Sequence, residues 1–359
     1  MNWLDKPAEV RSGEELAAGK LEAYLKSRLP DLAGSLSVRQ FPRGFSNLTY
    51  LLRFDDREVV LRRPPFGVKI KSAHDMGREY RILSKLISVY PKIPRPLLYC
   101  EDESVLGAPF YIMTRLKGVI LRPQMPKAMN PPPELMGRIA ESFIINLVEL
   151  HGLDYQEAGL ADLGKPEKYV QRQVEGWSHR YLNARTDEIP EMEQAVRWLS
   201  ENIPIESAAV LIHNDYKYDN IVLDPGDWAQ ITGVLDWEMA TTGDPLMDLG
   251  TSLGYWVQRD DPEELQELQF SPTTIPGNPS REELVSRYEQ LSGRRVDNVV
   301  FYYVYGLFKL AVIVQQIYAR YQRGHTQDPR FANLILAVEA CGHMAVQAIG
   351  KQRISSLMG

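Results

Sequence analysis

Two carboxylates and an amide lie along the middle of the chain in an arrangement that suits phosphoryl transfer. Asp215 and Asn220 share the polar stretch 213–220, and Asp236 follows the apolar segments after it. An alcohol becomes a nucleophile when a carboxylate accepts its proton, and nucleotide phosphates need magnesium held by amide and carboxylate oxygens. The sequence therefore predicts Asp215 as a catalytic base, with Asn220 and Asp236 as magnesium ligands.

The segment between these residues is predicted to be a β-hairpin. Residues 221–223 are apolar and indicate a buried strand, residues 224–227 carry Asp, Pro and Gly and indicate a turn, and residues 231–235 return as a second strand. A hairpin brings the end of its second strand beside the beginning of its first. We therefore expect Asp236 to lie beside Asn220, so that the two proposed ligands meet.

Two further charged residues lie close to these positions in the sequence. Lys217 follows Asp215 by two residues, where a fixed positive charge would stabilise the phosphoryl group in the transition state. An exposed loop lysine is the alternative interpretation. Glu238 follows Asp236 by two residues and could bind a second magnesium ion directly or through water.

On these motifs the chain resembles the aminoglycoside phosphotransferase and choline kinase-like enzymes, which share the two-lobed protein-kinase fold. Those enzymes carry a His-Gly-Asp loop that ends in Asn, an Asp-x-Glu segment and a later Asp-Pro-x-x-Asp-Leu segment. The corresponding residues are His213-Asn214-Asp215 to Asn220, Asp236-Trp237-Glu238, and Asp244-Pro245-Leu246-Met247-Asp248-Leu249. Asn214 stands where the family has Gly, and the resemblance implies that Asp248 ties the catalytic loop to the helix that follows.

The expected fold is α+β, with a small antiparallel-sheet lobe over residues 1–116 and a mainly helical lobe over 117–359. The chain has 359 residues, which exceeds the roughly 250–300 residues at which a single core usually stops growing. Helical spacing is found at 13–29 and 134–151, and the short apolar runs expected to form strands are 36–41, 48–54, 58–61, 94–100 and 109–113.

The loop at 42–47 is a candidate for binding nucleotide phosphates. Gly44 would let backbone amides approach phosphate oxygens closely, and Ser46 and Asn47 would add side-chain donors. By itself such a segment is more often an ordinary hairpin loop. Its similarity to the Gly-x-Ser-Asn-x-Thr stretch of the phosphotransferases favours the phosphate-binding interpretation.

The kinase fold places a phosphate-binding lysine on the third strand and pairs it with a glutamate on the next helix. Here the strand residue is Arg62, which keeps the positive charge but changes its geometry and reach. Glu79 is the expected partner. Its helix begins with the capping pair Ser72 and Asp75, and the apolar stripe beside it consists of Met76, Tyr80, Leu83 and Ile87.

The resemblance also implies an adenine pocket at the end of the small lobe. Met113 would form its back wall, and backbone groups of Thr114 and Leu116 would hydrogen-bond the base. A methionine beside a strand could also be an ordinary core residue. The implied cofactors are ATP or GTP, together with Mg²⁺.

Composition narrows the class of partner. The net charge of −6 and the pI near 5.7 give no overall basic charge of the kind that favours nucleic-acid binding, so we expect no nucleic-acid partner. Cys100 and Cys341 lie far apart without metal-ligand spacing, which is typical of buried thiols in a reducing compartment.

Neither a leader nor a membrane span is expected. Residues 1–6 include an acid and no apolar core of the kind found in signal peptides. The apolar stretch 299–318 is interrupted by Lys309 and by Gln315-Gln316, so it falls short of the ~20 consecutive apolar residues of a membrane-spanning helix. We expect a buried helix there, no membrane partner and a cytoplasmic location.

Three functions are compatible with these motifs: a kinase for a small hydroxylated molecule, a nucleotide-binding pseudokinase suggested by Arg62 and the sparse glycines, and a protein kinase. The missing Ala-Pro-Glu segment after Asp236 argues against a protein substrate. The runs Arg62-Arg63-Pro64-Pro65 and Tyr216-Lys217-Tyr218-Asp219 are similar to kinase domains fused to acyl-CoA dehydrogenases. That similarity implies a hydroxyacyl compound as the acceptor.

Overall fold

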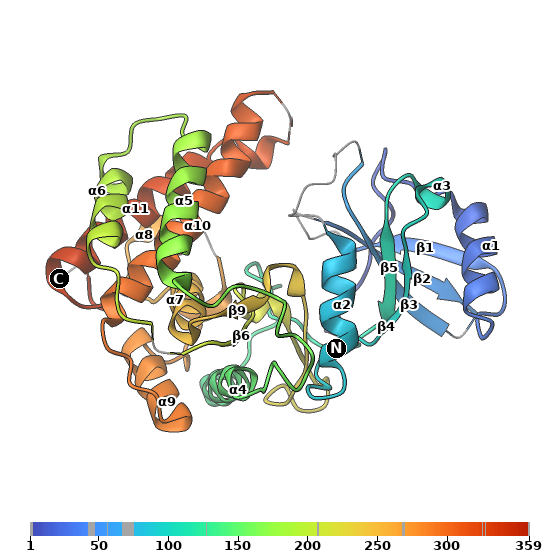
Figure 1. Ribbon diagram of the computed structural model, residues 1–359, viewed down its shortest axis with the longest axis horizontal. Helices are drawn as coiled ribbons and strands as arrows, with labels where there is room; N and C mark the ends of the chain where they lie inside the picture. Colours follow the sequence, from blue (N-terminus) through green and yellow to red (C-terminus); the bar gives the residue numbers. More distant parts are fainter. Residues whose placement is uncertain are drawn as a thin grey trace. The chain divides into compact units, whose positions relative to one another are not determined.

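The chain folds into two compact units in a computed structural model (Figure 1). The structure describes residues 3–41, 47–55, 57–66, 75–126, 128–206, 208–267, 270–324, 326 and 328–357. Unit 1 comprises Met1–Ile120, Ala158–Leu160 and Val222–Met239, and unit 2 comprises Leu121–Glu157, Ala161–Ile221 and Ala240–Gly359.

Unit 1 is built on a five-stranded antiparallel sheet in the order β1-β2-β3-β5-β4. Its strands are β1 (Leu36–Gln40), β2 (Leu48–Phe54), β3 (Arg57–Arg63), β4 (Pro96–Cys100) and β5 (Phe110–Thr114). The sheet confirms the predicted small antiparallel lobe. Buried side chains from β2, β3 and β5, including Leu52, Leu61 and Ile112, form its core, because alternate residues of a strand point to the same face.

Helices α1 (Ala18–Arg28), α2 (Met76–Leu86) and α3 (Glu103–Leu106) complete the sheet unit. α1 begins later than the predicted 13–29 and buries Leu21 and Leu25 against the sheet core. α2 begins after Asp75, whose carboxylate accepts the Arg78 amide at 2.9 Å, so Asp75 itself is the N-cap. Ser72, the other half of the predicted capping pair, lies outside the described residues.

The predicted hairpin is present as β7 (Ile221–Leu223) and β8 (Ile231–Val234), which pair with each other. It belongs largely to unit 1, whereas the sequence assigned all of 117–359 to the second lobe. Val119 and Leu223 exchange two backbone hydrogen bonds of 2.9 and 2.8 Å. A Cβ at Gly118 would lie 2.5 Å from the Leu223 carbonyl oxygen, so only glycine allows this approach. These contacts attach the hairpin to the sheet unit.

Unit 2 is mainly helical. Its helices and short strands are α4 (Pro133–His151), α5 (Tyr169–Ala184), α6 (Pro190–Glu201), β6 (Val210–Ile212), η2 (Tyr218–Asn220), β9 (Thr241–Gly243), α7 (Pro245–Tyr255), α8 (Glu263–Glu267), η4 (Pro272–Thr274), α9 (Arg281–Ser292), α10 (Val299–Gln322), η5 (Pro329–Phe331) and α11 (Leu334–Lys351). The predicted helices at 134–151 and 299–318 are confirmed. α10 packs against α5, α6, α7 and α11, which makes it the central helix of the unit.

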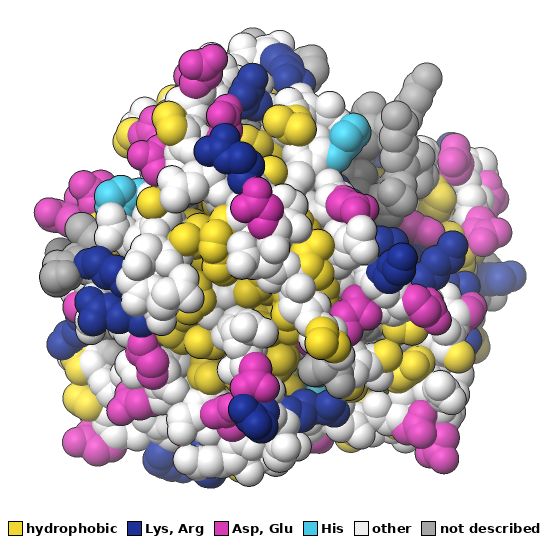
Figure 2. All heavy atoms as spheres, turned by 60° about the vertical axis from the view of Figure 1, so that its left-hand side comes forward, with side chains coloured by type: hydrophobic (Ala, Val, Ile, Leu, Met, Phe, Trp, Pro, Cys, Tyr) yellow, Lys and Arg dark blue, Asp and Glu magenta, His cyan; other side chains and the backbone are white. Residues whose placement is uncertain are grey.

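Among the residues that the structure describes, two helical segments are long and apolar enough to cross a membrane by length and composition, namely Val299–Gln322 and Pro329–Lys351. The protein itself buries 83% of the apolar window in the first, which is the behaviour expected of a core helix. Apolar side chains also reach the surface: Leu182 and Leu336 are 59% and 54% exposed. Figure 2 shows apolar side chains gathered over the middle of one face, with acidic and basic side chains interspersed around them.

Three glycines allow α7 and α10 to approach closely. A Cβ at Gly306 of α10 would lie 2.0 Å from the Gly250 carbonyl oxygen of α7, and a Cβ at Gly250 would lie 2.3 Å from the Tyr302 carbonyl oxygen. A Cβ at Gly254 of α7 would lie 2.7 Å from the carbonyl carbon of Gly306. The backbones of the two helices are therefore in contact, and no other residue type fits between them.

Gly306→Ala tests this contact. The added methyl group would overlap α7 backbone, so we expect the free energy of unfolding to fall by about 1–3 kcal/mol in denaturant titrations. Gly350→Ala is the matched control, because a Cβ there meets nothing within 4 Å. It should be neutral or stabilise by up to ~1 kcal/mol. Equal effects of the two substitutions would contradict the proposed close packing.

Candidate active site

The backbone of the predicted catalytic loop is held by one buried carboxylate in unit 2. Asp248 of α7 accepts the amides of His213 and Asn214, each at 2.7 Å. Asn214 has φ of 64°, a left-handed conformation that favours Gly and is tolerated by Asn. The family's Gly and this chain's Asn therefore meet the same requirement, and the role implied for Asp248 is confirmed.

Two histidines support this anchor. His151 of α4 places Nε2 at 3.2 Å from Asp248 Oδ2 and Nδ1 at 2.8 Å from the Tyr288 hydroxyl. Burial alone would raise the pKa of Asp248, but hydrogen bonds and charge from His151 and His213 outweigh it and lower that pKa. His213 Nδ1 accepts the Asp215 amide at 3.3 Å. Both histidines thus help to position the loop.

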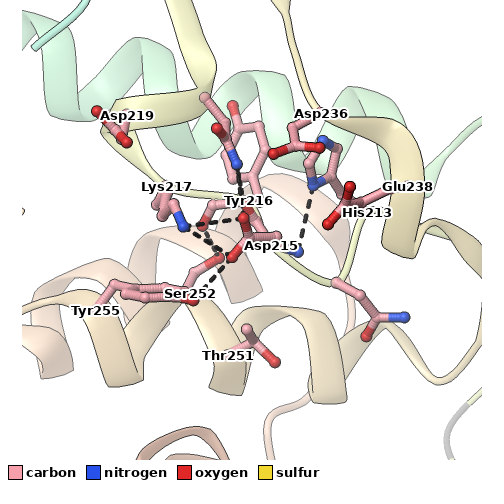
Figure 3. Close-up of polar contacts among 12 residues, drawn as sticks. His213, Asp215, Tyr216, Lys217, Asp219, Asp236, Glu238, Thr251, Ser252 and Tyr255 are labelled. Atoms are coloured by element: carbon pink, nitrogen blue, oxygen red, sulfur yellow. Dashed lines mark hydrogen bonds and ion pairs between the residues drawn. The ribbon is translucent and has the colours of Figure 1, made fainter. Parts of the chain in front are cut away.

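The Asp215 side chain is oriented by three donors (Figure 3). Its Oδ1 accepts the Tyr255 hydroxyl at 2.8 Å, and its Oδ2 accepts Asn220 Nδ2 at 2.8 Å. Lys217 Nζ lies 3.0 Å from Oδ1 and 2.9 Å from Oδ2. A carboxylate has about four acceptor sites, so these contacts fix the direction of the carboxyl group within the loop.

Lys217 is nearly buried, with its side chain 18% exposed. Burial alone would lower its pKa, but the negative charge of Asp215 outweighs this effect and raises it. The ammonium group also lies 4.5 Å from the centre of the Tyr255 ring. Lys217 therefore remains charged at neutral pH beside the predicted base.

The contacts of Asn220 define which side-chain atom could bind a cation. Its Nδ2 donates to the Asp215 carbonyl oxygen at 2.9 Å and to Asp215 Oδ2 at 2.8 Å. Both partners are acceptors, so the orientation of the amide is settled. Oδ1 is consequently the atom left to serve as a ligand, which is the oxygen type that magnesium prefers.

In unit 1, Arg62 joins three carboxylates. Nη1 bonds Glu79 at 2.8 Å, and Nη2 bonds Asp236 at 2.5 Å and Glu238 at 2.9 Å. The predicted pair of Arg62 with Glu79 is therefore present in the structure. Burial alone would lower the pKa of Arg62, but the charges of Asp236 and Glu79 raise it well above its ordinary value.

Backbone and amide donors complete this carboxylate cluster. Glu79 is 2% exposed and also accepts the Trp237 amide at 3.1 Å. Asp236 has φ of 67°, and the Asn47 side chain donates to Glu238 at 2.6 Å. The structure thus brings together four predicted site residues of unit 1, namely Asn47, Arg62, Asp236 and Glu238, with Glu79 behind them.

The remaining predicted nucleotide contacts are only partly described. Gly44 and Ser46 lie outside the described residues. Met113 is buried in β5 opposite Val60. The Thr114 amide donates to the Arg95 carbonyl oxygen at 2.8 Å, so this group is already engaged within the sheet. The Leu116 side chain lies against Gly233 of β8, where a Cβ would come within 2.2 Å of it.

The residues proposed as metal ligands provide oxygen donors only. Across the part of the chain that the structure describes, no group of three His, Cys, Asp or Glu side chains forms a ready-made metal cage. Magnesium characteristically takes one or two protein carboxylates and completes its shell with water and phosphate oxygens. Asn220, Asp236 and Glu238 are therefore of the type expected for Mg²⁺.

Two members of the catalytic-loop network were not predicted from the sequence. Tyr255 had no predicted role, yet its hydroxyl bonds Asp215. Lys309 was read only as an interruption of an apolar run, yet its Nζ bonds the Asn214 carbonyl oxygen at 2.6 Å. The sequence does contain a signal for Lys309, which is a single charge within an otherwise apolar helix. Because a buried charge needs a partner, such a residue indicates a polar contact with another segment.

Arg62→Ala tests the charge balance of the unit 1 cluster. It leaves Glu79 buried without its ion-pair partner, so we expect the free energy of unfolding to fall by about 3–5 kcal/mol in denaturant titrations. Arg53→Ala is the control, since the Arg53 side chain is 55% exposed where it pairs with Glu58. This control should lose at most ~1 kcal/mol. Similar losses in the two variants would contradict the cluster's structural importance.

Comparison with known proteins agrees with this geometry. A family model described as "Phosphotransferase enzyme family" matches residues 37–284. A Ralstonia eutropha structure, provisionally described as an aminoglycoside phosphotransferase, is 30% identical with a TM-score of 0.77, covering 94% of this chain and 99% of its own. A mutant of aminoglycoside phosphotransferase APH(4)-Ia, solved with ADP and hygromycin B, is 16% identical with a TM-score of 0.59, covering 91% and 98%. These likenesses confirm the predicted kinase-like fold.

A curated relative extends the comparison to a longer protein. Acyl-CoA dehydrogenase family member 11 of Gallus gallus is 38% identical over 331 residues, which is 89% of this chain but 41% of that protein. The chain thus spans about two fifths of the length of this relative. The match over residues 37–284 covers more than half of the chain and includes the Asp215 loop, the Asp236 segment and Asp248. The chain therefore belongs to the phosphotransferase enzyme family.

Proposed function

We propose that this protein is a magnesium-dependent phosphotransferase that moves the γ-phosphate of a nucleotide to a hydroxyl group of a small molecule. The observation that carries the proposal is the Asp215 carboxylate, oriented by Tyr255, Asn220 and Lys217 on a loop fixed by Asp248. Asp215 accepts the proton of the acceptor hydroxyl as its oxygen attacks the phosphorus atom. Family membership supports the reaction class.

The charged neighbours have complementary roles in this proposal. Lys217 supplies positive charge that stabilises the transferring phosphoryl group. For this role, one N–H of the Lys217 ammonium group must turn from Asp215 to a phosphate oxygen. Asn220 Oδ1, Asp236 and Glu238 are the oxygen ligands that would bind magnesium, and the metal would neutralise phosphate charge. β7 begins directly after Asn220 and β8 ends two residues before Asp236, so a single hairpin connects these ligands in the chain.

Unit 1 provides the groups proposed to bind the nucleotide. Arg62 binds phosphate oxygens in place of the usual lysine, and Asn47 assists from the beginning of β2. The backbone near Leu116 hydrogen-bonds the base. Two phosphotransferases of the same fold were solved with bound GDP or ADP, which supports a purine nucleotide as donor.

A hydroxylated acyl compound is the acceptor that we propose. The support is the relative named as a member of the acyl-CoA dehydrogenase family, of which this chain matches only a part. A phosphotransferase joined to an acyl-CoA enzyme would act on the same type of thioester. One protein of the same fold binds hygromycin B, so an aminoglycoside is the comparison acceptor in the assay.

Asp215→Asn tests the proposed chemistry. With Mg²⁺ and ATP or GTP, the wild-type protein should consume nucleotide when hydroxyacyl-CoA is added. The variant should lose about 10²–10⁴-fold in kcat because the base is gone, while calorimetry should show unchanged nucleotide binding. Asp219→Asn is the control, since Asp219 lies in the same loop but pairs with Arg122 at 2.9 Å. It should retain most of the activity.

The outcomes separate the proposed functions. Turnover with an aminoglycoside but not with acyl compounds would replace the proposed acceptor, and phosphorylation of protein alone would indicate a protein kinase. Tight nucleotide binding without turnover on any acceptor would identify the pseudokinase suggested by Arg62.

Metal dependence is tested separately with EDTA and with Asp236→Asn. Chelation should abolish turnover, and Mg²⁺ should restore it. The variant loses one oxygen ligand and should need a higher Mg²⁺ concentration for half-maximal rate. An unchanged Mg²⁺ requirement would remove Asp236 from the proposed ligand set, leaving Asp215 as the base unaffected.

A further inference from the structure

Lys309 is a buried charge in the central helix of unit 2. It lies in α10 and is 2% exposed. Its Nζ donates to the Asn214 carbonyl oxygen at 2.6 Å and to Thr251 Oγ1 at 3.5 Å. Taking an ammonium group out of water is costly unless partners compensate. These partners belong to the predicted catalytic loop and to α7, which indicates that the buried ammonium group serves to hold the loop.

The close packing of α7 and α10 allows this reach. Gly306 lies one turn before Lys309 on α10, and residues three apart share a helix face. A Cβ at Gly306 would be 2.0 Å from α7 backbone, so this face lies directly against α7. From there the Lys309 side chain extends to the loop that Asp248 of α7 also anchors.

The bond from Lys309 fixes one particular peptide group. The Asn214 carbonyl and the Asp215 amide belong to the same planar unit. Its oxygen accepts Lys309 Nζ at 2.6 Å, and its N–H donates to His213 Nδ1 at 3.3 Å. Asn214 is also the residue with φ of 64°. Lys309 and His213 therefore hold opposite ends of the peptide that precedes the base.

We propose that Lys309 is a positioning residue for Asp215, holding the 214–215 peptide in the orientation from which the carboxylate meets the acceptor hydroxyl. This inference rests on the proposed function for its kinetic consequences. Its structural part, that Lys309 restrains the loop, holds independently of turnover. Lys309 does not touch the reacting atoms and acts through Asn214.

The charges around Lys309 set the pH range of this role. Burial lowers its pKa, and Lys217 and Arg180 lower it further, while Asp215 and Asp248 raise it, with a net result of about 8. The Trp177 ring lies 5.7 Å from Nζ. The groups that face Lys309 thus come from the catalytic loop, α5 and α7.

Activity and stability should respond to this ionisation in opposite directions. As pH rises through about 8, Lys309 loses its charge and its strong bond to Asn214, so turnover should decline. In the unfolded chain the same lysine stays protonated up to about 10.4. Between these values the unfolded state binds more protons, so this group's contribution to folding stability rises with pH. Lys217 cannot account for the decline, because its pKa is raised.

The kinetic test compares Lys309→Met with Lys309→Arg in the full chain. Met removes the donor, and kcat at pH 7 should fall about 10²-fold through misplacement of the base. KM for nucleotide should stay unchanged, because unit 1 keeps its contacts. Arg keeps the charge at all accessible pH values, so it should restore activity and remove the decline above pH 8. A decline that persists unchanged in an active Arg variant would overturn the proposal.

A second measurement does not depend on turnover. Amide hydrogen exchange of peptides covering 211–218 should be faster in Lys309→Met than in the wild type, with the thermal unfolding midpoint similar or higher. Gln315→Met is the control, since Gln315 is also buried in α10 but bonds Ala184 and Thr186. It should leave exchange in the loop unchanged.

The two measurements distinguish failure of this proposal from failure of the proposed function. If no acceptor supports turnover but loop exchange rises in Lys309→Met alone, the restraint is real and the proposed function is wrong. If the wild type is active and Lys309→Met alters neither loop exchange nor kcat, the positioning role is wrong. Equal acceleration of loop exchange in the Gln315→Met control would also overturn it.

Discussion

The buried carboxylate of Asp248 is the constraint on which the candidate active site depends. It takes two consecutive amides, those of His213 and Asn214, and this geometry requires the backbone to turn sharply between them. The chain makes this turn at Asn214, which has a left-handed backbone conformation. Since Asp248 is 0% exposed, its charge is compensated only by protein groups, and His151 supplies the side-chain partner. The direction of the base follows from this anchor.

Buried charges at the candidate site are compensated by backbone groups and by opposite charges. In unit 2, Asp248 and Lys309 each bind the main chain of the loop, whereas Asp215 pairs with Lys217. In unit 1, one guanidinium faces the carboxylates of Glu79, Asp236 and Glu238. Arg78 adds a second guanidinium beside this cluster, because its Nη1 donates to the Glu238 carbonyl oxygen at 3.0 Å. The acidic side chains of unit 1 are therefore compensated by arginine side chains.

Local patterns predicted the strands of the five-stranded sheet, the β7–β8 hairpin, helices such as α4 and α10, and the motifs, because alternation and helical spacing depend on neighbours in sequence. Contacts between distant segments could not be predicted in this way. The hairpin joins unit 1 through Gly118 and Val119, about a hundred residues before it. Tyr255 reaches Asp215 from the end of α7, and Lys309 reaches Asn214 only because Gly306 allows two helices to touch. These relationships depend on tertiary packing, which periodicity does not encode.

The arginine at position 62 changes the unit 1 cluster beyond keeping a positive charge. A lysine ammonium is a compact point charge, whereas the guanidinium is a planar fork with donors in fixed directions. Nη1 is directed to Glu79 while Nη2 is shared by Asp236 and Glu238, so one side chain holds the helix glutamate and the two proposed metal ligands of unit 1. Arg62 therefore holds both carboxylates in place in this structure. In the proposed function, a bound cation would be a second positive partner for these oxygens, and Arg62 Nη2 would then be able to turn to phosphate.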